Sequence, residues 1–222
     1  MASAAISVAV GAALLWVAAA QPAPGDPKKR IKVADQAYAR SVLLRKADLP
    51  AGRWRIESTD FSQPNPACVV KHYSLGALTA TAQAGFTYTL GGGIPVIESD
   101  ANMFLTAAQA QRAVSISTKL GLARCLGAAF AAEVQKNTSG VSANVVKVEA
   151  FSFAGLGATA RGFRIVLQLR SSQSVTSLDT VLVIVRRARA VAWLSLVQAG
   201  SAWPSSTVRS LAATTAGRMT KH

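Results

Sequence analysis

The sequence predicts an α+β fold, a single domain in which an antiparallel β-sheet packs against helices. The patterns run in the order helix, strands, helix, strands, helix, which is typical of this class. The chain has 222 residues, half of them apolar, which is enough for one well-buried core. In "TARGFRIVLQLR" (159–170), Phe163, Ile165, Leu167 and Leu169 share one side of a strand and polar residues the other. One face of the sheet is therefore core and the other is partly wet.

Residues 1–20 have the pattern of a secretory signal peptide or an N-terminal anchor. An uncharged apolar run extends from Ala4 to Ala20, and Ala18 and Ala20 occupy the small-residue positions of a cleavage site. No Lys or Arg precedes this run, so the alternatives to cleavage are an uncleaved anchor or a start upstream of Met1. In either form we expect an exported protein, extracellular or in the cell envelope. Residues 21–33 then form a basic, Pro-rich linker, and residues 34–222 form the α+β domain.

The two cysteines, Cys68 and Cys125, are expected to form a disulfide bond. An exported chain meets an oxidising compartment, where paired thiols are oxidised. The bond would stabilise the fold by roughly 4 kcal/mol on the chain-entropy model. The alternative is that Cys125 is a small buried residue of a helix face and Cys68 is a loop thiol.

The first part of the domain is predicted to contain two helices and three strands. A helix over 34–46 must end before Pro50, because the residue before a proline avoids the helical region. Strands are expected over 54–58, 82–89 and 94–99, with Gly91 to Gly93 as a hairpin loop and not a phosphate-binding loop. One long helix is expected over 106–135, since apolar residues recur there at helical spacing and place Cys125 toward the core.

The second part is predicted to be mostly strand. Strands are expected over 144–153, 159–170, 178–187 and 190–200, followed by a helix over 204–220. The short connection of Arg187, Ala188 and Arg189 makes the last two strands a hairpin, although such a turn prefers Gly where Ala188 stands.

Four short segments share a pattern with a known group of domains. They are "LLRKADLPAGRW" (43–54), "CVV" at Cys68, "ESDANMFLTAAQAQRAV" (98–114) and "ARCL" around Cys125. Together they resemble exported sensor-type domains of actinobacteria, the group that includes the PknH-like extracellular domain. The resemblance implies a sensor-like ligand-binding domain that ends in the hairpin 181–196. We expect the chain to depart from the kinase-linked members in having one cysteine pair and no attached kinase.

Candidate catalytic residues are few. We therefore expect that the protein is not an enzyme, that it has no catalytic residues and that it binds no cofactor. His72 is the only histidine before the last residue, and a lone loop histidine is typically solvated. Glu98 and Asp100 would share one face of a strand, but this spacing fits a solvated edge as well as an acid/base pair. We expect no metal site, because two isolated cysteines and two histidines do not make the four ligands of structural zinc.

Basic residues dominate the charge, with 24 Lys and Arg against 10 Asp and Glu. Arg186, Arg187 and Arg189 cluster at the predicted hairpin and are candidate anion-binding residues. Nucleic acid is an unfavoured partner, because aromatic residues are not interleaved with the cations. The leading prediction is therefore an exported, non-enzymatic domain that binds an unknown envelope ligand. The alternative is a structural or adhesive envelope protein whose basic surface binds anionic polymers or lipid headgroups.

Overall fold

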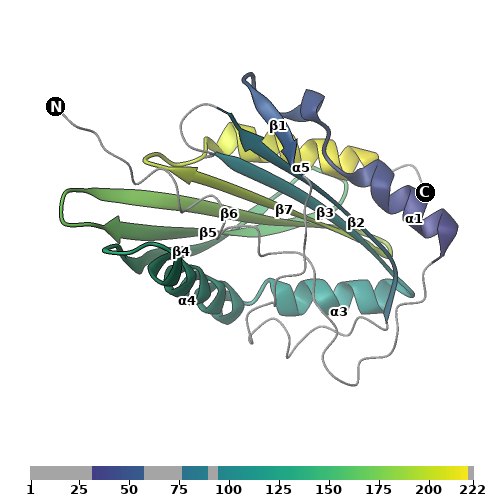
Figure 1. The fold of residues 1–222 in the computed structure, drawn as a ribbon. Coiled ribbons are helices and arrows are strands. Elements are labelled where there is room, and N and C mark those ends of the chain that lie inside the picture. The colour runs from purple at the N-terminus through teal and green to yellow at the C-terminus, as the bar shows by residue number, and fades with distance from the viewer. Residues whose placement is uncertain (1–31, 58–76, 90–94, 220–222) are drawn as a thin grey trace.

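A computed structural model of the protein describes residues 32–57, 77–89 and 95–219. A single seven-stranded antiparallel sheet forms the centre of the fold, with strand order β1-β2-β3-β7-β6-β5-β4 (Figure 1). The strands are β1 (Trp54–Glu57), β2 (Leu78–Tyr88), β3 (Val96–Phe104), β4 (Ser142–Phe153), β5 (Thr159–Arg170), β6 (Val175–Arg187) and β7 (Ala190–Ala199). The predicted α+β class is confirmed.

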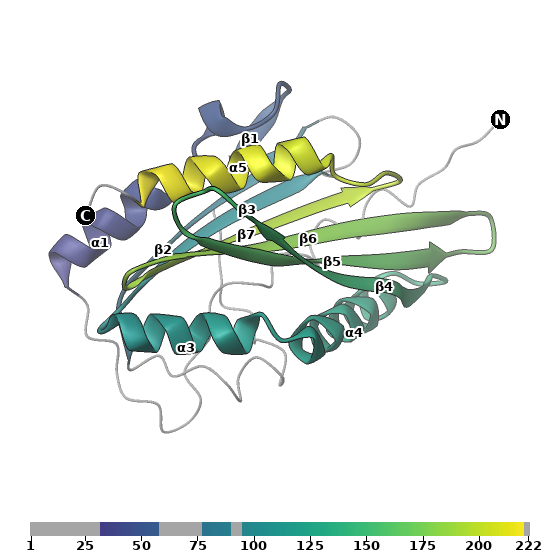
Figure 2. The same ribbon diagram turned by 180° about the vertical axis from the view of Figure 1, so that it is seen from behind.

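Helices cover both faces of the sheet. Helices α1 (Val33–Val42) and α5 (Ser205–Arg218) lie on one face, and α3 (Ala107–Ser117) and α4 (Leu120–Asn137) lie on the other (Figures 1 and 2). A short 3₁₀ helix, η1 (Lys46–Asp48), follows α1. Among the described residues, no helix has the length and apolarity needed to cross a membrane.

Strand alternation divides the core between these two faces. Val181, Val183 and Val185 of β6 pack with α1 and α5, whereas Leu182 and Ile184 face α4 and α3. The same period of two holds for β5, whose Phe163, Ile165, Leu167 and Leu169 are all buried against α4, as predicted. Both faces of the central strands are therefore buried, and the prediction of one wet face applies only toward the edges.

The single helix predicted over 106–135 is wrong, because the segment forms two helices. Helix α3 ends at Ser117, Lys119 has an extended backbone, and α4 begins at Leu120. The Thr118 hydroxyl donates to the carbonyl of Val114 at 2.9 Å and closes the last turn of α3. The break lets α3 and α4 pack on separate core clusters at the two ends of the twisted sheet.

Other boundaries shift by a few residues, and the largest shift concerns β3. The sequence predicts a strand over 94–99, whereas β3 continues to Phe104 through a polar stretch of Ser99, Asp100 and Asn102. This stretch is buried because β2 and β7 flank β3 on both sides. The predicted signal peptide or anchor and most of the predicted linker lie outside the described residues.

Candidate functional site

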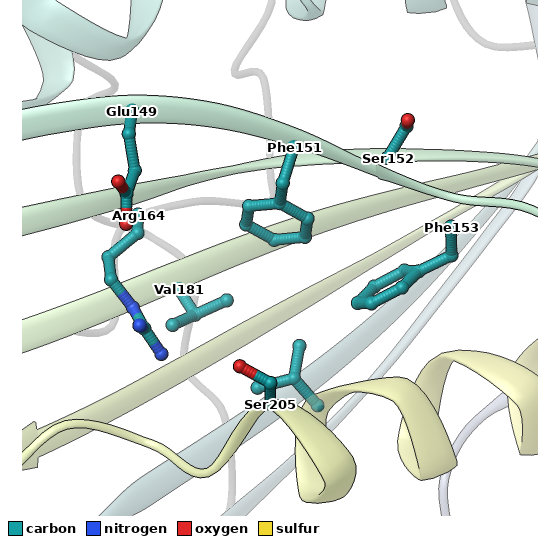
Figure 3. A pocket seen from close by; sticks show the side chains of 8 residues that line it. Glu149, Phe151, Ser152, Phe153, Arg164, Val181 and Ser205 are labelled. Atoms are coloured by element: carbon teal, nitrogen blue, oxygen red, sulfur yellow. The ribbon is translucent and has the colours of Figure 1, made fainter.

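A cavity of about 170 Å³ lies between the sheet and the start of α5, and we call it the aromatic cavity. It is lined from strands β4, β5 and β6 and from α5 by Glu149, Phe151, Ser152, Phe153, Arg164, Val181, Ser205 and Val208. Figure 3 shows Phe151 and Phe153 directed from β4 toward the part of α5 that carries Ser205. Four of the eight lining residues are apolar and four are polar or charged, and small-molecule sites likewise combine apolar walls with polar groups.

Strand alternation and one glycine shape the aromatic wall of this cavity. Phe151 and Phe153 are two residues apart on β4 and meet edge to face, with ring centroids 5.3 Å apart. Phe151 is paired across the strands with Gly162 of β5. A Cβ atom at Gly162 would come within 2.6 Å of the Phe151 ring and 2.2 Å of the Leu182 carbonyl oxygen. Only glycine therefore lets the ring lie over the β5 backbone.

Arg164 supplies a fixed positive charge in the cavity wall. Its Nε lies 3.2 Å from Oδ1 of Asp179, and one Nη donates to the Trp203 carbonyl at 2.6 Å. The Trp203 N–H in turn donates to the other oxygen of Asp179 at 2.8 Å. Burial raises the pKa of Asp179, while this N–H and the arginine act in the opposite direction. The network holds the guanidinium in place and ties the segment before α5 to the sheet.

The amino end of α5 borders the same cavity through Ser205 and Val208. Ser205 is the first helical residue, and the preceding Pro204 provides no side-chain cap for the free backbone N–H groups. Arg209, one turn further, lies 5.8 Å above the Phe153 ring and donates to the Ala154 carbonyl at 3.0 Å. The charged groups at this end of the cavity are largely paired, Arg164 with Asp179 and Glu149 with Lys147.

The three candidate anion-binding arginines do not form one cluster. Arg186 and Arg187 are neighbours in β6, so their side chains project to opposite faces of the sheet. Arg187 and Arg189 line a second hollow of about 200 Å³, the hairpin cavity, between the β6–β7 hairpin, α1 and the end of α5. Anion binding by these residues stays a prediction, with Arg187 as its best-placed member.

Arg189 is engaged within the fold. It forms a two-pronged ion pair with Asp35 of α1, at 2.7 and 3.1 Å, and donates to the Phe104 carbonyl at 3.0 Å. Thr79 also donates to Asp35, at 2.5 Å. The arginine and this hydroxyl lower the pKa of Asp35 against the effect of its burial. Arg187, by contrast, donates only to the Gly157 carbonyl, at 3.2 Å, and none of the ion pairs of the described residues includes it.

The cysteine prediction is only partly accessible to the structure. Cys125 lies on α4, is half-buried and is not a free thiol. Cys68 lies outside the described residues, as does His72. The pairing of Cys68 with Cys125 therefore stays a prediction.

Glu98 and Asp100 share one face of β3, as the sequence predicts, but they do not lie on a solvated edge. Each side chain is 2% exposed, in the third strand of the sheet and beneath the helices α3 and α4. Burial raises the pKa of both carboxyl groups well above their usual values, and the charge of Asp100 adds to the effect on Glu98. For Asp100, a hydrogen bond from the Gln83 amide lowers the pKa and offsets a smaller part of the effect of burial.

The sequence did not reveal the aromatic cavity, because its lining comes from four separate elements. The available signal was "AFSFAG" (150–155), in which two phenylalanines alternate with small residues on an edge strand. A position such as Gly162 inside an otherwise well-formed strand also indicates a close approach to the backbone.

No protein-family model matches the chain, and none of the curated proteins matches it. Among solved structures, the fold is similar to the extracellular domain of PknH from Mycobacterium tuberculosis. The two share 10% sequence identity with a TM-score of 0.45, over 92% of this chain and 100% of that domain.

Proposed function

We propose that the protein is an exported, non-enzymatic domain that binds a cell-envelope ligand in the aromatic cavity, in the manner of a sensor domain. The observation that carries the proposal is the combination in one cavity of two phenylalanines, a fixed guanidinium and an uncapped helix start. Such a combination recognises a ligand that has both an apolar group and a polar head.

The size of the cavity limits what enters it. A cavity of about 150 Å³ holds a benzene-sized group, and the aromatic cavity encloses about 170 Å³. We infer that one ring or a short alkyl segment of the ligand inserts between Phe151 and Val208. The rest of a larger or polymeric ligand would stay outside, with its hydrogen-bonding head at Ser205 and Arg164.

The non-enzymatic character of the proposal is supported by the position of the carboxyl groups. A general acid or base must reach the reacting atoms of a substrate. Glu98 and Asp100 are buried on the face of the sheet opposite the aromatic cavity. Within the cavity, Glu149 is the one carboxylate of the lining.

The test is a pair of matched substitutions at the start of α5. Ser205→Tyr places a ring at the cavity, whereas Ser206→Tyr makes the same change at an exposed neighbour that does not line it. Binding of short-chain phospholipids and peptidoglycan fragments is followed by saturation-transfer NMR. The proposal predicts a ligand that loses its signal with the first variant and keeps it with the second. Binding that both variants retain, or absence of binding to the unchanged protein, contradicts it.

The alternative, an adhesive protein acting through its basic surface, is favoured by the net charge of +14. It predicts salt-sensitive binding to dextran sulfate and to anionic vesicles. Changing Arg186 and Arg187 together to glutamine would weaken that binding, while Ser205→Tyr would leave it unchanged. Arg189 is left in place in this experiment, because its ion pair with Asp35 contributes to the fold.

Export is tested separately, by intact mass of the protein recovered from its native host. A chain that begins at Gln21, and that reacts with a thiol reagent only after reduction, supports export and a bond between Cys68 and Cys125. A full-length chain with two reactive thiols contradicts both.

A further inference from the structure

The centre of the sheet contains a group of buried polar side chains that the proposed function does not use. Glu98 and Asp100 lie two residues apart on β3 and face α3 and α4. Ser195 of β7 pairs directly with Glu98 across the strands, and Gln83 of β2 pairs directly with Asp100. Directly opposite residues of an antiparallel pair share a face, so all four side chains project into the same space.

Several atoms of this group have no hydrogen-bond partner, although they are out of contact with water. They are both carboxylate oxygens of Glu98, Oδ1 of Asp100 and Oγ of Ser195. Glu98, Asp100 and Ser195 are each 2% exposed. Buried polar atoms are nearly always hydrogen-bonded in folded proteins, and a buried carboxylate needs a partner of opposite charge.

The described part of the protein supplies no such counter-charge. None of its ion pairs includes Glu98 or Asp100. Strands β2 and β7 contain no charged residue. The basic residues of the helices packed on this face are exposed, and they are Arg112, Lys119, Arg124 and Lys136.

We propose that Glu98, Asp100 and Ser195 form a buried binding site for a hard divalent cation of the Ca²⁺ or Mg²⁺ class. The four oxygens without a partner are carboxylate and hydroxyl oxygens, which are the ligands that these cations prefer. No group of three His, Cys, Asp or Glu side chains occurs among the described residues. Hydroxyl and water ligands must therefore complete the coordination, and hard cations accept these whereas soft ones select thiolate.

The spacing of the two carboxylates suits a shared ion. Residues two apart on a strand are separated by roughly 7 Å along it and project to the same side. The longer side chain of Glu98 and the shorter one of Asp100 can reach one ion between them.

The site is independent of the aromatic cavity, because the two lie on opposite faces of the sheet. A ligand could bind at the cavity without the cation, and the reverse also holds. Failure of one proposal is therefore distinguishable from failure of the other.

The experiment titrates the full chain, freed of metal by chelation, with CaCl₂ and separately with MgCl₂ at pH 7.5. Isothermal calorimetry and the thermal unfolding midpoint are the two readouts. We expect saturable binding of one ion by one of the two cations, and a midpoint that rises with its concentration. Glu98→Gln and Asp100→Asn should each weaken binding by about tenfold or more, and Ser195→Ala by a smaller factor. Glu133→Gln, on α4 and away from the group, should bind as the unchanged protein does.

Circular dichroism establishes that each variant is folded before it is titrated. Two carboxylate variants and Ser195→Ala are used so that the loss of one variant to misfolding leaves the test intact. The proposal is overturned if the unchanged protein shows neither heat nor a midpoint shift with either cation. It is also overturned if the folded variants at Glu98, Asp100 and Ser195 all bind as tightly as the unchanged protein.

Discussion

Replacing Glu98 by glutamine tests how the fold accommodates two buried carboxyl groups without a counter-charge. Glutamine has nearly the same shape as glutamate and carries no charge. In metal-free buffer, burial raises the pKa of Glu98 and Asp100 well above their usual values. The folded protein therefore keeps protons that the unfolded chain, with pKa values of about 4.3 for Glu and about 3.9 for Asp, releases in mildly acidic solution.

The sign and size of the effect follow from proton linkage. Between the unfolded and the folded pKa, the folded state binds more protons, so the free energy of unfolding falls as the pH rises. The slope is about 1.4 kcal/mol per pH unit for one carboxyl group that stays protonated in the fold. From pH 5 to pH 7 the loss is therefore at most about 3 kcal/mol for each of the two groups. The stabilising contribution of the two protonated carboxyl groups is thus fully present below about pH 4, and it is lost as the pH rises.

The assay is urea unfolding of the unchanged protein and of Glu98→Gln at pH 5, 6 and 7, with a chelator present. We expect the variant to gain stability relative to the unchanged protein as the pH rises, by at most about 1.4 kcal/mol per pH unit. Asp179 has a raised pKa too, but it is present in both proteins and cancels in the comparison. Glu133→Gln serves as the control and should show a constant difference. A difference for Glu98→Gln that does not change with pH would refute the reasoning.

Three further predictions concern single contacts. Arg189→Met should destabilise the fold by about 2 kcal/mol in urea unfolding, because it leaves Asp35 buried without its cation. This value lies between those of exposed and buried ion pairs. An unchanged unfolding midpoint would show that solvent screens the pair. Ala188 has φ of 48°, so Ala188→Gly should stabilise by about 0.5–1 kcal/mol in thermal unfolding, and a lower midpoint would contradict this explanation. Gly162→Ala should destabilise the fold by about 1–3 kcal/mol, since its Cβ would lie 2.2 Å from the Leu182 carbonyl oxygen. An unchanged stability, measured by calorimetry, would contradict this and would mean that β5 and β6 move apart at no cost in free energy.

The sequence by itself determined the elements whose pattern is local. The alternation of Phe163, Ile165, Leu167 and Leu169 predicted the buried side of β5, and the short connection at Ala188 predicted the β6–β7 hairpin. The unfavourable residue at that turn was also visible, and Ala188 has the positive φ that a glycine adopts more readily. Each of these features depends on residues close in the chain, where period and turn chemistry are sufficient.

The sequence predicted which candidate site residues lie together only where those residues are neighbours in the chain. The shared face of Glu98 and Asp100 follows from a period of two, whereas their burial depends on β2, β7, α3 and α4. The hairpin arginines were visible as a cluster, but the engagement of Arg189 requires Asp35, which lies 154 residues away.

Tertiary structure decided the features that bring distant segments together. A polar stretch such as 98–102 is typical of an exposed strand by hydropathy, yet β3 is enclosed between β2, which precedes it in the chain, and β7, which comes much later. The helix break at Thr118 arises because α3 and α4 pack on separate parts of a twisted sheet. The aromatic cavity likewise exists only where β4, β5, β6 and α5 meet, because its walls are contacts between segments that no local pattern specifies.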